Sequence, residues 1–120
     1  MELSNFNFSC PHCLHTVMKN DSIELSTNRV SGEEGLIRMD SKIGNYSFEH
    51  IPPIQFVSGE RIKFLCPHCR ADLTSKDYPD YALLSMDVGS GINFDVIFSL
   101  IAGRRETRII TEDGIETYME

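Results

Sequence analysis

The sequence predicts a mainly β fold in which two matching cysteine turns flank a β-hairpin insertion and antiparallel strands follow toward the C-terminus. Short runs of alternating apolar and polar residues recur along the chain, separated by glycine- and proline-containing turns, and this period of two is typical of strands. The tetrapeptide Cys-Pro-His-Cys also occurs twice, at 10–13 and 66–69. With 120 residues, 41% of them hydrophobic, the chain is long enough for a single domain, 1–120.

The net charge and the length of the apolar segments argue against some classes of function. A formal net charge of −7, from 18 acidic and 11 basic side chains, opposes the broad positive potential through which proteins bind nucleic acid or anionic membranes non-specifically. The N-terminal residues do not resemble a secretory signal, and the most apolar segment, 92–102, is roughly half the length of a membrane-spanning helix. We therefore expect a cytoplasmic protein that makes no contact with membranes.

Each copy of the tetrapeptide follows a short predicted strand. Phe6 and Phe8 alternate with polar residues before the first copy, and Ile62 and Phe64 hold the equivalent positions before the second. This internal repeat predicts two equivalent turns, each reached by a strand and each presenting two thiols.

The first hairpin of the insertion is predicted from alternation on both sides of a turn signal. The alternating runs are 37–43 and 46–48, and the Gly-Asn pair at 44–45 is typical of a two-residue hairpin loop. A loop of those two residues would place Met39 opposite His50 on the neighbouring strand.

A second hairpin is predicted to follow the first. The two prolines at 52–53 end the preceding strand, because proline has no amide hydrogen to donate to a neighbouring strand. Residues 54–57 are then expected to pair with 61–65 around the Ser-Gly pair at 58–59. That pairing would lead the chain directly into Cys66.

Residues 74–81 are predicted as a turn or a single helical turn, and two interpretations compete for the apolar segment 92–101. As a strand, its alternate residues line one face. As a helix, it would begin at an N-cap on Asn93 and end at Gly103. We favour the strand, because β-branched and aromatic residues fill the segment.

The last predicted element is a hairpin of 106–111 with 115–119, around the Asp-Gly pair at 113–114. The segment 92–101 is apolar on both faces if it is a strand. It must then lie at the centre of its sheet or be covered by another chain. A homodimer through residues 92–119 is therefore one hypothesis for a partner.

The four cysteines are predicted to bind one metal ion. Two residues between paired cysteines let both sulfurs face the same side of a turn, and two such pairs supply the four soft ligands that tetrahedral zinc prefers. The 52 residues between the pairs are no obstacle if the intervening hairpins return the chain. The expected cofactor is one structural Zn²⁺, with Cys10, Cys13, Cys66 and Cys69 as its ligands.

With these motifs the chain resembles the zinc-ribbon class, in which Cys-Pro-x-Cys knuckles at hairpin ends share one zinc ion. The resemblance implies a zinc-ribbon-like pair of knuckles with a four-cysteine site at the positions named above. In such knuckles the residue after the second cysteine is commonly a glycine with positive φ, whereas this chain has Leu14 and Arg70 there. His12, His68 and Arg70 are candidates for contacts around the ligands, because four thiolates already complete a tetrahedral site.

Two other chemistries use the same cysteines. A rubredoxin-like iron site for electron transfer has the same four thiolates, and the missing glycines and the long insertion count against it. The tetrapeptide also resembles the active site of thiol oxidases, whose fold places a strand, a helix and a strand around the motif. The common catalytic motifs are absent from the sequence, and a closed four-thiolate site leaves no position for a reactive water, so we expect no enzymatic activity.

The sequence favours a binding or regulatory module that contacts protein partners. Arg104, Arg105 and Arg108 form a basic cluster, which is the candidate contact for a partner or for nucleic acid. Acidic residues close in sequence weaken the positive potential of this cluster, which makes nucleic acid the less favoured partner. The alternative function is a transcription-associated zinc ribbon that binds nucleic acid. Within the single domain we expect a knuckle-containing part, 1–76, and a β-rich extension, 77–120.

Overall fold

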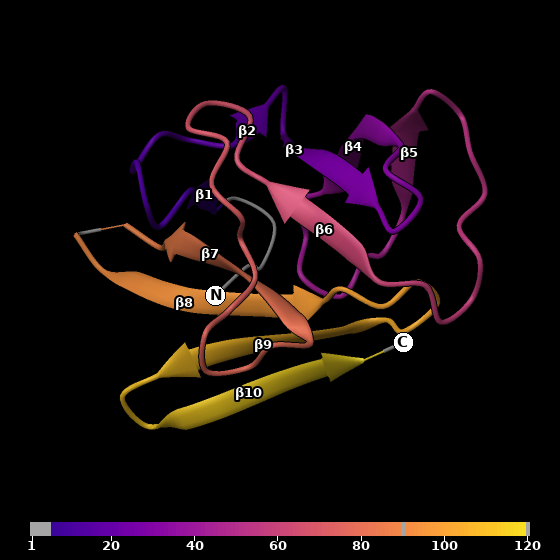
Figure 1. The fold of residues 1–120 in the computed structure, drawn as a ribbon. Helices are drawn as coiled ribbons and strands as arrows, with labels where there is room; N and C mark the ends of the chain where they lie inside the picture. The colour runs from indigo at the N-terminus through magenta and orange to yellow at the C-terminus, as the bar shows by residue number, and fades with distance from the viewer. Residues whose placement is uncertain (1–5, 90, 120) are drawn as a thin grey trace.

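The computed structural model describes residues 6–89 and 91–119, which form two antiparallel sheets (Figure 1). The mainly β prediction is confirmed, and the described residues contain no helix, hence none that could span a membrane. The first sheet has the order β1 (Asn7–Ser9), β7 (Tyr81–Asp87), β8 (Asn93–Ser99), β9 (Glu106–Thr111) and β10 (Gly114–Met119). The second has β2 (Met18–Lys19), β3 (Ser22–Arg29), β4 (Glu34–Asp40) and β5 (Phe48–Ile51), and β6 (Ile62–Leu65) also pairs with β3.

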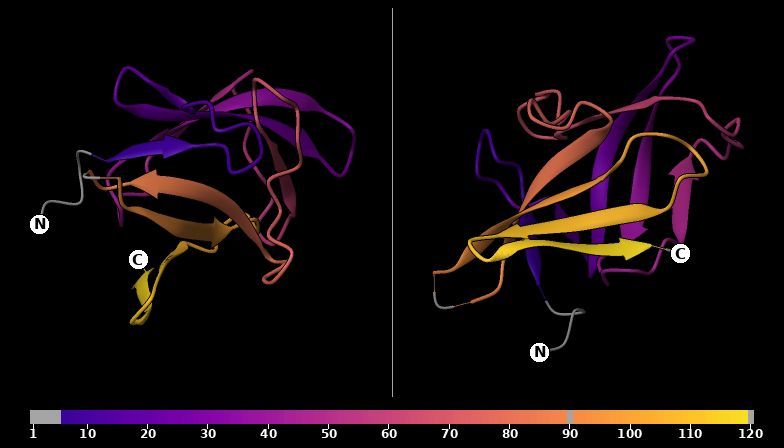
Figure 2. Two further views of the ribbon diagram at one scale, coloured as in Figure 1. Left: turned by 90° about the vertical axis from the view of Figure 1, so that its left-hand side faces the viewer. Right: turned by 90° about the horizontal axis from the view of Figure 1, so that it is seen from below.

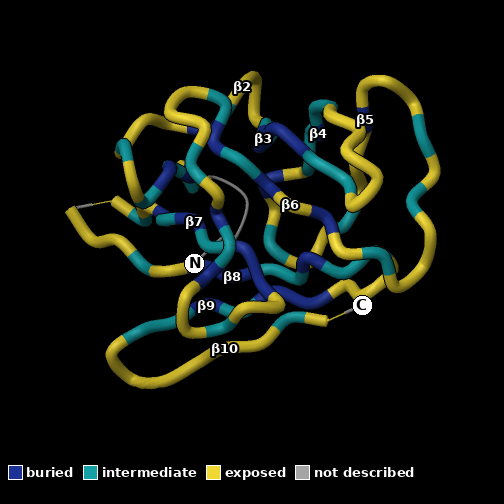
Figure 3. The backbone as a smooth tube through the Cα atoms, viewed as in Figure 1, coloured by how far each residue is buried: buried dark blue, intermediate teal, exposed yellow. Residues whose placement is uncertain are grey.

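The apolar faces of the two sheets form one common core (Figures 2 and 3). Leu84 and Val96 from the first sheet and Leu25 and Phe64 from the second all belong to the same cluster of buried side chains. The rings of Phe64 and Phe98 meet edge to face across this core, with 5.2 Å between their centroids. Strand β1, from the knuckle-containing part of the chain, pairs with β7 of the extension, so both parts contribute to one sheet.

A corner connects the two sheets beside β6. The amide of Ile62 donates to the carbonyl of Leu100 at 2.9 Å, and the amide of Ala102 donates to the carbonyl of Glu60 at 2.8 Å. The Glu60 carboxylate accepts two hydrogen bonds from the guanidinium of Arg29, at 2.7 and 2.9 Å, which fixes the corner to β3. These bonds hold the segment that follows β8 beside β6, the strand that leads to the second knuckle.

The first predicted hairpin exists as β4 and β5, but its predicted register is wrong by two residues. Met39 lies opposite Phe48, and the connecting loop is longer than two residues. Both carboxylate oxygens of Asp40 accept hydrogen bonds from this loop, and the Asp40 amide donates to the carbonyl of Ser47 at 3.2 Å. The shift places Arg38 opposite Glu49, so opposite charges face each other where the predicted register had two carboxylates.

The second predicted hairpin is wrong in its pairing. Residues 54–57 form no strand, and β6 pairs with β3 instead, from Arg29 opposite Ile62 to Ser26 opposite Leu65. The turn itself is present, because the amide of Glu60 donates to the carbonyl of Val57 at 3.0 Å. Pairing with β3 carries Ile62 and Phe64, the alternating apolar residues of β6, into the common core, whereas the residues before the turn are only half-buried or exposed.

The predictions for the extension are largely confirmed. The segment 92–101 contains strand β8, which lies at the centre of its sheet with Ile97 fully buried. The last hairpin is present as β9 and β10, but its two-residue loop is Glu112 and Asp113 rather than the predicted Asp-Gly pair at 113–114, because Thr111 pairs with Gly114. Residues 74–80 contain turns and no helix. Strand β7, which follows that turn, was not predicted from the sequence, and it is buried on both faces over much of its length.

Candidate metal centre

Two turns of the same construction follow β1 and β6. In the first, the amide of Cys10 donates to the carbonyl of His15 at 3.0 Å, and the amide of Leu14 donates to the carbonyl of Cys10 at 2.9 Å. The second turn repeats both bonds, from Cys66 to Ala71 at 3.0 Å and from Arg70 to Cys66 at 2.9 Å. The internal repeat is therefore a repeat of backbone structure as well as of sequence.

The residue after the second cysteine takes the backbone conformation that glycine usually supplies. Leu14 has φ of 65° and Arg70 has φ of 64°, so both lie in the left-handed region. That region costs an L-residue with a side chain roughly 1–2 kcal/mol. The departure from the zinc-ribbon pattern thus leaves the knuckle geometry intact at some cost in free energy. Arg70 also donates to the Ser26 hydroxyl on β3 at 2.9 Å, which ties its knuckle to the second sheet.

The two knuckles bring four sulfur atoms together. The Sγ atoms of Cys10 and Cys69 are 3.8 Å apart, those of Cys13 and Cys66 are 3.7 Å apart, and all four lie within 4.8 Å of one another. A tetrahedral ion with metal–sulfur bonds of about 2.3 Å has its sulfurs about 3.8 Å apart, whereas a disulfide bond is about 2.0 Å long. The cluster therefore fits one tetrahedral metal ion held by four cysteines.

The cluster has a buried side and a surface side. Cys10 and Cys66, the first cysteines of their knuckles, are fully buried, whereas Cys13 is partly buried and Cys69 is exposed. Both buried cysteines belong to the common core cluster, together with Phe8 and Phe64 from the strands that precede them. A metal ion can enter from the surface side, and once bound by the four sulfurs it lies beside the common core.

The protein groups around the sulfurs favour the thiolate form at one buried cysteine and oppose it at the other. Burial raises the pKa of Cys10 to about 12, despite amide hydrogen bonds that act in the opposite direction. Burial is the largest single influence on Cys66 and acts to raise its pKa, but the amides of Cys69 and His68 together with hydrogen bonds from the Cys13 and Cys69 thiols lower that pKa below its ordinary value. Because metal ions bind thiolates, coordination at Cys10 displaces a proton at neutral pH.

The knuckle histidines contact the cluster through their backbone. The amide of His12 lies 3.3 Å from the Cys10 sulfur, and the amide of His68 lies 3.4 Å from the Cys66 sulfur. The ring of His68 stacks on the ring of His15, with 5.1 Å between centroids, and so joins the two knuckles. Sequence reasoning missed His15, and the repeat carried no signal for it, because Ala71 holds the equivalent place in the second knuckle.

The predicted arginine cluster is organised around one buried carboxylate. Glu106 receives hydrogen bonds from Arg108, at 3.0 and 3.3 Å, and from the hydroxyl of Tyr81, and Arg104 lies 3.9 Å away. The Arg108 guanidinium also lies over the Tyr81 ring, 5.2 Å from its centroid. Arg105 faces elsewhere, toward the loop 42–47. The three arginines therefore do not form one continuous basic surface.

In comparisons with known proteins, no family model, curated protein or solved structure matches the chain. The functional conclusion therefore depends on the chemistry of the four-cysteine cluster and of the surfaces around it.

Proposed function

We propose that the protein is a zinc-stabilised binding or regulatory module, in which one structural Zn²⁺ joins the two sheets and a protein partner is bound without chemical change. The position of the cluster carries this proposal. Cys10 and Cys13 follow β1 of the first sheet, whereas Cys66 and Cys69 follow β6 of the second. One ion bound by all four sulfurs therefore cross-links the sheets, which gives metal binding a direct effect on folding.

Two features of the cluster count against a thiol oxidase, and two others count against a rubredoxin-like iron site. All four thiols converge on one point, whereas a thiol oxidase needs one pair in isolation. Four sulfur ligands complete a tetrahedral zinc site and leave no open position for water. The residues in the left-handed region after the knuckles are Leu14 and Arg70 rather than glycines, and 52 residues that include several strands separate the two pairs. The rubredoxin-like alternative keeps the same ligands, so elemental analysis is the deciding measurement.

Protein purified without added metal is expected to be colourless and to contain one equivalent of zinc by elemental analysis. An iron tetrathiolate absorbs strongly in the visible range, so a red sample containing one equivalent of iron would overturn the assignment of zinc. The same preparation of Cys69→Ser serves as the control, because it should retain much less metal than the wild-type protein.

A protein partner is favoured over nucleic acid by the arrangement of charges. Glu106 neutralises much of the charge on Arg104 and Arg108, and the chain as a whole carries a net charge of −7. Strand β10 forms one edge of its sheet, and its free edge is a suitable surface for a partner strand or a second copy of the chain. The central strand β8 is covered on both sides by neighbouring strands of its own chain.

Binding to duplex and single-stranded oligonucleotides is expected to be weak, as measured by filter binding over a series of salt concentrations. A protein that neutralises several phosphates loses affinity steeply as salt is added. A steep loss of this kind, abolished by combining Arg104→Ala with Arg105→Ala, would replace the protein-binding proposal with nucleic-acid binding. The matched control is the pair Lys19→Ala and Lys76→Ala, which removes the same charge from other parts of the surface.

A further inference from the structure

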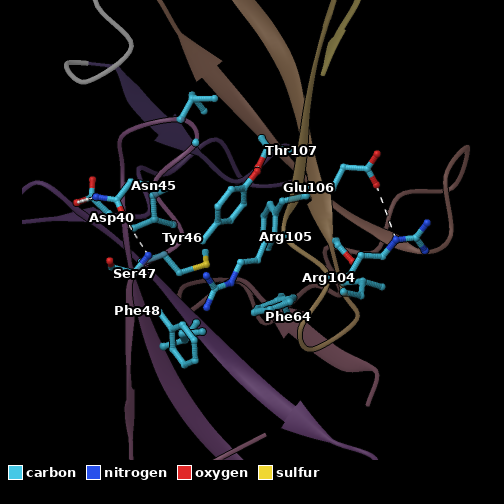
Figure 4. A pocket seen from close by; sticks show the side chains of 18 of the residues that line it. Asp40, Asn45, Tyr46, Ser47, Phe48, Phe64, Arg104, Arg105, Glu106 and Thr107 are labelled. Carbon is cyan, nitrogen blue, oxygen red and sulfur yellow. Dashed lines mark hydrogen bonds and ion pairs between the residues drawn. The ribbon is translucent and has the colours of Figure 1, made fainter. Parts of the chain in front are cut away.

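A cavity of about 210 Å³ lies between the two sheets, apart from the metal ligands (Figure 4). Its inner wall is formed by side chains of both sheets, and its mouth lies between the β4–β5 loop and the segment that joins β8 to β9. The apolar residues of the inner wall include Ile23, Ile37, Phe64, Leu84, Val96 and Phe98. None of the four cysteines lines the cavity.

The size and the lining of the cavity fit the apolar part of a small molecule. Protein interiors contain few voids larger than a water molecule, because each one forfeits packing contacts. This cavity exceeds the roughly 150 Å³ of an engineered apolar cavity that accepts benzene. Scaled from the six carbons of benzene in that engineered cavity, this one accommodates about eight carbons.

The mouth of the cavity differs from its interior in carrying charged groups. Lys42 and Arg105 both line the mouth, and the Arg105 guanidinium lies in the centre of the view in Figure 4, on the side of the loop that carries Tyr46 and Ser47. The two carboxylates of the lining are engaged by protein groups. Asp40 accepts hydrogen bonds from the Lys42 amide at 2.8 Å and from the Asn45 side chain at 3.0 Å.

Glu106, the other carboxylate of the lining, is directed toward the Tyr81 hydroxyl and Arg108. Arg104 also lines the cavity and lies close to Glu106, as the dashed line in Figure 4 shows. The Tyr46 hydroxyl donates to the Tyr118 carbonyl at 2.9 Å and lies 3.1 Å from the Thr107 hydroxyl, which holds the loop against the first sheet. Among the described residues that line the cavity, the cationic side chains are Lys42, Arg104 and Arg105, and the anionic ones are Asp40 and Glu106.

We propose that the cavity binds a small amphipathic anion, an aliphatic carboxylate with an apolar chain of about seven carbons. The chain occupies the space between the sheets, and the carboxylate lies at the mouth beside Lys42 and Arg105. Burial of the chain supplies most of the affinity, since each buried methylene strengthens binding about fourfold. The cations at the mouth favour a negatively charged head group. Each exposed cation strengthens binding of the anion by up to about fivefold.

The test uses octanoate, octanol, octylammonium and butanoate as probes of the zinc-loaded full-length protein, with binding measured by isothermal titration calorimetry. Octanoate is expected to bind more tightly than octanol, and octylammonium more weakly than either. Butanoate should bind about two orders of magnitude more weakly than octanoate, because it lacks four methylenes. Equal affinity for the three head groups, or no binding of octanoate at millimolar concentration, would overturn the proposal.

Variants locate the site. Lys42→Gln is expected to weaken octanoate binding by up to about fivefold and to leave octanol binding unchanged, and Lys76→Gln, outside the cavity, should change neither. Ile43→Trp at the mouth should block all of the probes. Octanoate should also shift the amide resonances of cavity-lining residues in the wild-type protein, a measurement that does not depend on any variant folding. Shifts confined to other surfaces would place the ligand elsewhere and contradict the proposal.

Discussion

Cys66→Ser is expected to lower the free energy of unfolding by about 5 kcal/mol or more, the largest effect of any single substitution considered for this protein. Structural zinc contributes on the order of 10 kcal/mol or more to folding when four thiolates are present. Loss of one thiolate weakens that contribution, and it does so at a position that is fully buried in the core. An ordinary domain has only about 5–15 kcal/mol of stability in total, so the variant should be largely unfolded.

Circular dichroism during thermal and denaturant unfolding measures this effect, with and without a zinc chelator. Chelation should destabilise the wild-type protein strongly and the Cys66→Ser variant little, because the variant has already lost tight metal binding. His12→Ala is the matched control, since His12 contacts the cluster through its amide, which the substitution retains. An unchanged melting temperature in both the variant and the chelated wild-type protein would remove the structural role of the metal.

Glu106→Gln is expected to lower the free energy of unfolding by about 2–3 kcal/mol at neutral pH. The side chain is almost completely buried and is the common partner of the Tyr81 hydroxyl and the Arg108 guanidinium. A hydrogen bond to a charged group contributes roughly 1.5–3 kcal/mol, and the amide can replace only part of this arrangement. Urea unfolding followed by fluorescence or circular dichroism measures the difference.

The effect of Glu106→Gln should also depend on pH. The hydrogen bond from Tyr81, together with Arg108 and Arg104, lowers the pKa of Glu106, although burial acts to raise it. A carboxyl whose pKa is lower in the folded state stabilises the protein above its unfolded pKa of about 4.3 and loses that stabilisation as the pH falls through the folded pKa. The difference between wild type and variant should therefore be constant near pH 7 and shrink under acidic conditions.

The exposed residue Glu112, in the loop between β9 and β10, offers a control for this pH dependence. Glu112→Gln removes the same charge outside the buried network and should leave both the stability and its acid dependence close to those of wild type. If Glu106→Gln and the wild-type protein lose stability in parallel as the pH falls, the carboxylate of Glu106 is not a source of the acid sensitivity.

The metal cluster was predicted from the sequence because its chemistry is local. Each knuckle places two thiols on one side of a short turn, and the identical pair of turns indicates four ligands for one ion, whatever path the chain takes between them. A strand within 92–101 and a hairpin turn near 113–114 were also predicted, because neighbouring residues supply the β-branched or aromatic side chains of the strand and the turn signal of the hairpin. These features depend on interactions within a few residues.

Tertiary structure decided everything that required a choice of distant partner. Strand β6 pairs with β3 because that position carries Ile62 and Phe64 into the common core, and no signal in the segment 61–65 identifies β3 as its neighbour. The register of β4 and β5 likewise differs from the one that the Gly-Asn turn signal predicted, because the chain forms a longer loop over 41–47.

The basic cluster and the cavity also depend on contacts between segments that are distant in sequence, so the sequence did not predict how they are arranged. Three nearby arginines suggested one surface, but packing of β7 against the rest of the first sheet places Tyr81 and Glu106 together and draws Arg108 to them. The cavity exists only where two sheets from both parts of the chain enclose it. The sequence by itself determined the two cysteine turns and the other local turns. The pairing of strands, the ion pairs of the arginines and the cavity arose only when distant segments buried their apolar faces in one core.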